Sequence, residues 1–181
     1  MAETLNYALK RTTQPQAEPL SLAEAKLFLR VDGSAEDGLI MDMMVAVREA
    51  AEDYLHKSLV TQNWTMALEG YAPSRVVLPK GPVQSISEVR TRDRNGNEAV
   101  VDASLYHLSD VENAIHFESA IIAHEVKVTY VCGYGDAQDV PYAVRQGMLA
   151  HLVALYEDRL GGMPLPAATV ALYKPHRYVR V

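Results

Sequence analysis

The motif Gly133-Tyr134-Gly135, within "VTYVCGYGDAQDVPYAVRQGMLAHLVALYEDR" at residues 128–159, resembles two kinds of functional loop. A potassium filter of the Val-Gly-Tyr-Gly type requires surrounding membrane helices, but no stretch of this chain approaches the ~20 apolar residues of a membrane span. A phosphate-binding loop requires a lysine and a serine or threonine after its second glycine, whereas Gly135 is followed by Asp136. We therefore interpret the motif as a turn between a strand and a helix, in which the glycines adopt backbone angles that other residues disfavour.

Metal ligands and nucleophiles are the next candidates. Six histidines are spread along the chain: His56, His107, His116, His124, His151 and His176. Because they lack the i, i+4 spacing and the cysteine partners of a zinc site, we expect them to be surface or half-buried side chains. Cys132, the only cysteine, lies on the same alternating side as Val128 and Tyr130, which favours a buried small residue over a reactive thiol.

Two pairs of carboxylates, Asp136 with Asp139 and Glu157 with Asp158, have a spacing that acid–base chemistry could use. Their positions at the two ends of a predicted helix favour helix-end and surface charges instead, with Asp139 as a cap. The sequence therefore predicts that the protein is not an enzyme and that it has no catalytic residues, no cofactor and no metal site.

The balance of charge argues against a protein that grips nucleic acid. The 181-residue chain has a formal net charge of -6, and nucleic-acid affinity depends largely on clustered lysine and arginine. A helix-turn-helix around "VDGSAED" is excluded because residues 36–53, its second helix, combine six acidic residues with Arg48 alone.

The elements that must position these side chains form a predicted α+β fold that is mainly helical. Ser21 with Glu24 makes a capping-box signature, and apolar residues recur at helical spacing in three segments. We therefore predict three main helices, at residues 21–31, 35–56 and 140–160. The second and third helices should pack together and bury Met43, Val47, Val144 and Leu152.

Between the second and third helices, the helical spacing gives way to alternation, as in Trp64, Met66 and Leu68. Residues 61–132 are therefore predicted to form a central β insertion. The insertion should be antiparallel, because its connections are too short for helical crossovers.

The length of the chain and its 49% hydrophobic composition favour one domain. We expect an extended N-terminal lead-in at residues 1–19 and a single domain at residues 20–162. Residues 163–181, which include three prolines, are predicted to form an extended C-terminal arm.

Three separated motifs occur in a characteristic order: "LSLAEAKLFLRVDGSAEDGLIMDMMVAVREAAEDYLHKSLVTQNW", "LPKGPVQSISEV" and the segment at residues 128–159. In this order and spacing the chain resembles the head-to-tail connector (adaptor) family of long-tailed phages and phage-like gene transfer agents. The resemblance covers Leu20 to Leu160. It departs from the family at Cys132, where a small residue such as alanine is expected, and at Gly147, which costs a helix interior about 1 kcal/mol relative to alanine.

The resemblance implies a structural role in the neck of a virion or phage-like particle, for a protein made in the bacterial cytoplasm. A ring of about twelve copies would lie below the portal protein, extend the DNA channel and meet a tail-side neck or stopper protein. DNA would pass through without sequence-specific binding, and no membrane would be involved. Two alternatives are a small phage-encoded hydrolase or nuclease, and an acidic regulator that binds a host protein.

The C-terminal segment "LYKPHRYVRV" concentrates positive charge and aromatic surface in an otherwise acidic chain. Pro175 prevents a continuous helix, and the alternation that follows it suits a chain that lies extended along another protein. By resemblance to connectors that anchor through their C-termini, we expect the arm to insert between portal subunits. The predicted portal-binding residues are Tyr173, Lys174, Pro175, His176, Arg177, Tyr178 and Arg180.

Overall fold

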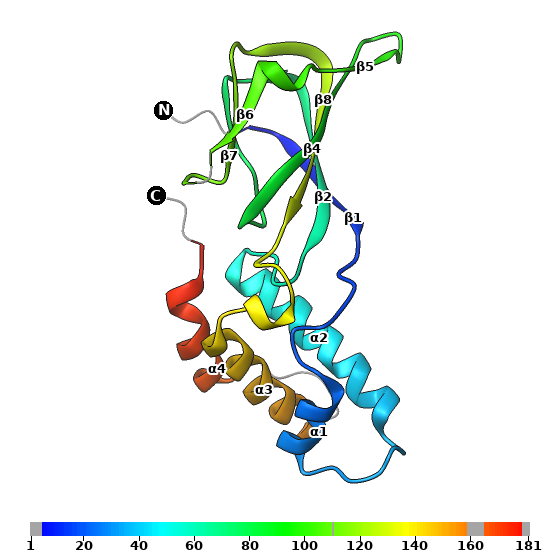
Figure 1. Cartoon of the computed structure of the whole chain (residues 1–181), viewed down its shortest axis with the longest axis vertical. Helices are drawn as coiled ribbons and strands as arrows, with labels where there is room; N and C mark the ends of the chain where they lie inside the picture. Colours follow the sequence, from blue (N-terminus) through cyan, green and yellow to red (C-terminus); the bar gives the residue numbers. More distant parts are fainter. Residues whose placement is uncertain (1–4, 110, 159–164, 179–181) are drawn as a thin grey trace. The chain divides into compact units, whose positions relative to one another are not determined.

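The computed structural model describes residues 5–109, 111–158 and 165–178. Over these residues the chain forms eight β-strands and four α-helices (Figure 1). The strands are β1 (Tyr7–Thr13), β2 (Gln62–Ala72), β3 (Arg75–Val77), β4 (Val83–Arg92), β5 (Glu98–Val100), β6 (Tyr106–Ser109), β7 (Ala114–Phe117) and β8 (Ile121–Cys132). The helices are α1 (Leu22–Leu29), α2 (Asp37–Leu55), α3 (Tyr142–Glu157) and α4 (Ala167–Tyr173). No helix within these ranges is long and apolar enough to cross a membrane.

The prediction of a mainly helical fold, with three main helices, a central β insertion and an extended C-terminal arm, is wrong. The strands form two antiparallel sheets that hold about as many residues as the helices, and a fourth helix is present. The arm prediction fails because prolines bracket a helix instead of preventing one: Pro166 immediately precedes α4, and Pro175 follows it. The predicted helices exist, however, and α1, α2 and α3 lie inside their predicted ranges.

The described residues divide into two compact units. The β unit comprises residues 5–15 and the described part of 61–133, and the helical unit comprises residues 16–60 and the described part of 134–181. Each unit has its own cluster of buried apolar side chains.

The β unit is built on a five-stranded sheet in the order β1-β2-β8-β4-β5, with a second sheet in the order β3-β7-β6 (Figure 1). Every strand pair in the two sheets is antiparallel, as the short connections predict. The central pair, β2 and β8, places buried residues opposite one another: Trp64 with Tyr130, Met66 with Val128, and Leu68 with Val126. The alternation in the sequence therefore identifies the buried face correctly.

The helical unit is organised around α3, which contacts each of the other three helices. Val47 of α2 and Val144 and Leu152 of α3 are wholly buried in one cluster, and Met43 is partly buried against it. The predicted packing of the second and third helices is confirmed.

A buried ion-pair network fixes the chain before α1 to α2. Arg48 is only 2% exposed; its Nε donates to Glu18 at 2.8 Å and its Nη1 to Glu52 at 3.1 Å. Glu52 is buried too, and it accepts a hydrogen bond from the backbone N–H of Leu59 at 2.9 Å. Since a buried charge is tolerated only when it is paired and hydrogen-bonded, this network is a structural feature of α2 and not a surface charge pattern.

Candidate functional site

The Gly-Tyr-Gly motif is a turn, as predicted. Gly133 and Gly135 have φ angles of 127° and 130°, which side chains rarely adopt. Tyr134 is held by its backbone N–H, which donates to the carbonyl of Leu59 at 3.0 Å, and by Lys57, whose Nζ lies 3.1 Å from the tyrosine hydroxyl. The motif therefore joins β8 to the helical unit.

Of the carboxylates near this turn, Asp139 accepts a hydrogen bond from a backbone N–H. The N–H of Asp136, the N-cap of the 3-10 turn η2 (Ala137–Asp139), donates to Asp139 Oδ2 at 2.8 Å. Asp139 thus caps a short turn and not α3, which begins at Tyr142. Glu157 ends α3 and is exposed.

The histidines are mostly separate, with one pair that the sequence analysis missed. The register of β6 and β7 places His107 opposite His116, and their rings stack with centroids 5.3 Å apart. His116 Nε2 also lies 3.3 Å from Glu112 Oε2. Among the described residues there is no group of three or more histidine, cysteine or acidic side chains that could hold a metal ion. Cys132 is wholly buried in the β unit, as predicted.

The C-terminal candidate residues begin inside the core of the helical unit. Tyr173 is wholly buried, its ring centroid lies 5.9 Å from that of Tyr54, and burial raises the pKa of its hydroxyl. The ring packs over Gly147 of α3, where a Cβ would overlap it. Thr169 Oγ1 donates to the carbonyl of Gly147 at 3.2 Å. Gly147 is therefore the position that admits α4.

The residues after Tyr173 follow the surface of the same unit. Lys174 and Pro175 are exposed in the 3-10 turn η3 (Lys174–His176), and His176 is half-buried. The exposed Arg177 places its guanidinium 5.1 Å from the ring centroid of Tyr54 and lies 3.4 Å from His56 Nε2.

The end of the described segment is held by its backbone. The N–H of Tyr178 donates to the carbonyl of Leu55 at 3.0 Å, and the Tyr178 side chain is half-buried. Arg180 lies outside the described residues. We call Lys174 and Arg177 the C-terminal cationic patch.

The C-terminal segment is thus folded onto the helical unit, and it presents the exposed cations Lys174 and Arg177. The chain belongs to the phage gp6-like head-tail connector family, whose model matches residues 19–127. This family consists of structural connectors and not enzymes. The match confirms the predicted resemblance and the structural connector function, and it gives no support to the hydrolase or regulator alternatives.

Three solved structures are similar to this chain over 96% of its length. A chain in the neck of an empty GTA particle, computed with C6 symmetry, has a TM-score of 0.84 at 24% identity over 97% of that chain. A chain in the virion of a native gene transfer agent (GTA) particle has a TM-score of 0.79 at 25% identity over 96% of that chain. A chain in the neck of a native GTA particle, computed with C12 symmetry, has a TM-score of 0.80 at 23% identity over 97% of that chain. A search of curated proteins gives no significant match.

Proposed function

We propose that the chain forms a closed ring of about twelve copies in the neck of a phage or phage-like particle. The observation that carries this proposal is the likeness, over 96% of the chain, to proteins in GTA necks with C6 and C12 symmetry. Rotational symmetry of this kind is generated by head-to-tail contacts between neighbouring copies. A connector ring would lie below the portal protein, extend the DNA channel and present its other side to a tail-side neck or stopper protein.

The C-terminal cationic patch is the proposed portal-contacting surface. Lys174 and Arg177 are exposed cations on a chain whose net charge is -6, so they can meet acidic groups of a portal protein. Tyr173 lies in the core of the helical unit. We therefore assign it the role of holding the segment in place, while the residues after it make the contact. Arg180, which lies outside the described residues, is retained as a portal-binding residue in this proposal.

Passage of DNA without sequence-specific binding fits the chain's composition. The formal charge is -6, and two acidic residues of α2, Glu49 and Asp53, are exposed. A ring rich in exposed carboxylates would repel phosphates and so would not hold the genome as it passes.

The portal contact is tested by reversing two exposed charges. Lys174→Glu with Arg177→Glu should leave the fold intact and reduce co-purification with the portal protein by about tenfold or more, because like charges would then face each other. The matched control is Lys10→Glu with Arg94→Glu, which reverses two exposed cations of the β unit and changes the net charge equally.

Loss of portal binding in the first variant alone supports the assigned surface. Equal binding by the wild type and both variants rejects the patch. Equal loss in both variants indicates that only the overall charge matters, and it rejects the patch as well. Thermal unfolding of each variant establishes that binding is compared between folded proteins.

A further inference from the structure

The end of α1 carries an exposed apolar group with a cation beside it. Leu27 is 82% exposed and Phe28 46% exposed, although both belong to a helix whose Ala25 is wholly buried. Arg30 follows as the left-handed C-cap, with φ 58°, and is exposed. Its guanidinium pairs with no carboxylate among residues 5–109, 111–158 and 165–178. We call Leu27, Phe28 and Arg30 the α1 knob.

The outer side of α2 carries a second apolar group, with a carboxylate beside it. Met41 is 48% exposed and Val45 37% exposed, one helical turn apart. Asp42 lies next to them, is exposed, and forms no ion pair with a described cation. We call Met41, Asp42 and Val45 the α2 stripe. Residues of α2 that face the core, such as Val47, are wholly buried, so the stripe is directed away from the core.

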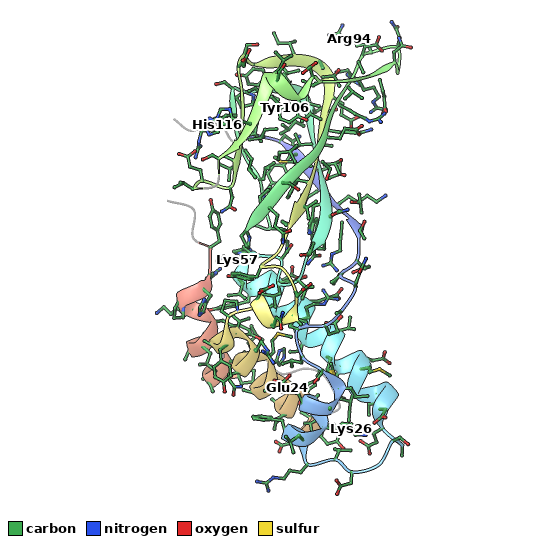
Figure 2. All side chains as sticks on the ribbon, in the orientation of Figure 1. Glu24, Lys26, Lys57, Arg94, Tyr106 and His116 are labelled. Atoms are coloured by element: carbon green, nitrogen blue, oxygen red, sulfur yellow. The ribbon has the colours of Figure 1, made fainter. Side chains whose placement is uncertain are left out.

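The knob and the stripe are held in a fixed relation within each copy. Lys26 Nζ donates to Asp37 Oδ1 at 2.6 Å and also bonds the carbonyl of Gly33, which ties the end of α1 to the start of α2. Glu24 receives two hydrogen bonds from Arg145 Nη2, at 2.8 and 3.0 Å, which tie α1 to α3. Figure 2 shows Glu24 and Lys26 on α1, within the helical unit. A contact built on these helices is pre-organised, since little backbone has to be ordered on binding.

We propose that the α1 knob of one copy docks on the α2 stripe of the next copy in the ring, an inference that rests on the proposed ring. The two surfaces match in composition: each has two exposed apolar side chains, the knob adds an exposed cation, and the stripe adds an exposed carboxylate, neither of them in an ion pair within the described part of the chain. Docking would cover Leu27 and Phe28 with Met41 and Val45 and bring Arg30 to Asp42. In the proposed ring the knob and the stripe of each copy contact different neighbours, so the contact is head-to-tail.

A charge-swap experiment tests this pairing. Arg30→Asp and Asp42→Arg are made singly and together, each variant is co-expressed with the portal protein, and ring–portal complexes are measured by mass photometry. Each single variant places like charges in every contact of the ring and should lower the ring population by about tenfold or more. The double variant restores an opposite-charge pair with the positions exchanged, and it should form rings within about threefold of the wild type.

A second variant guards against effects on folding. Leu27→Asp should abolish rings without changing thermal unfolding, because the side chain is exposed in the single copy. Val111→Asp is the matched control, since Val111 is 92% exposed but belongs to the β unit. Wild-type ring levels in both single charge variants, or a double variant as defective as the single ones, reject the proposed contact while leaving the ring itself standing. Failure of the wild type to form any ring on the portal rejects the proposed function instead.

Discussion

Gly147 controls how closely α4 approaches α3. Its missing side chain leaves room for the ring of Tyr173, and its carbonyl accepts a hydrogen bond from Thr169 at 3.2 Å. From the sequence alone, a glycine inside a helix is expected only to lower the stability of the helix, by about 1 kcal/mol relative to alanine. The structure supplies the reason for that cost, because the close approach buries an entire tyrosine side chain.

Gly147→Ala should therefore destabilise the helical unit, even though alanine is the better helix former. The new methyl group would overlap a buried aromatic ring that has little freedom to move. We expect a net loss of about 1–3 kcal/mol in the free energy of unfolding, measured by urea denaturation. A gain in stability would show that α4 does not pack on α3 in this way.

His151 makes the helical unit sensitive to acid. Partial burial on α3 lowers its pKa below the ordinary value of 6.5, and its Nδ1 has no hydrogen-bond partner among the described residues. The unfolded chain therefore binds a proton at a higher pH than the folded chain, so the stability contributed by the neutral ring is lost as the pH falls below 6.5.

His151→Leu should flatten that dependence. Between pH 7 and about 5, the melting temperature of the variant should fall less than that of the wild type. Carboxylates elsewhere contribute equally to both curves, so the difference between the curves isolates this residue. Parallel curves for the two proteins would show that His151 has the same pKa in the folded and unfolded chains.

At the scale of secondary structure, α4 depends on its packing. A seven-residue helix is not stable alone in water, so the segment is helical because Tyr173 is anchored against α3.

Tyr173→Ala should lower the free energy of unfolding by about 3–5 kcal/mol and increase amide exchange throughout α4. Tyr173→Phe is the matched control: the tyrosine hydroxyl has no described hydrogen-bond partner, so its removal should leave stability unchanged or raise it. Equal effects of the two substitutions would contradict the anchoring role.

The elements that the sequence predicts correctly are those with a periodic pattern. Trp64, Met66 and Leu68 alternate because one face of β2 is buried, and α2 shows helical spacing because one side packs on α3. The features it misses depend on tertiary contacts. α4 needs Gly147, 20 residues before its start, and the burial of Arg48 depends on Glu18, 30 residues earlier.

Short-range spacing in the sequence also does not reveal which residues are paired across two strands, because that pairing depends on the register of the strands. His107 and His116 are nine residues apart, and only the hairpin of β6 and β7 stacks their rings. The exposed cations of the C-terminal segment were visible as a composition bias, but their attachment to a folded helix was not. The sequence could thus show which C-terminal residues are candidate surface cations, but it could not show that the segment carrying them is folded.

At the scale of the whole molecule, the proposed surfaces make two different contacts that a connector needs. The α1 knob and the α2 stripe would join neighbouring copies, and the C-terminal cationic patch would join the ring to the portal. Both kinds of contact repeat in every copy, so individually weak exposed pairs of about 1 kcal/mol or less gain through avidity. The family assignment gives the role of the chain, and these surfaces give a physical account of how it could be carried out.

The most direct test of this account is cryo-electron microscopy of the neck of purified particles that contain this chain. We predict a single closed ring of the chain between the portal and the tail, with rotational symmetry about the DNA channel. In that ring, α1 of each copy should contact α2 of its neighbour, and the C-terminal segment should face the portal. A neck without a ring of this chain between portal and tail would contradict the central claim.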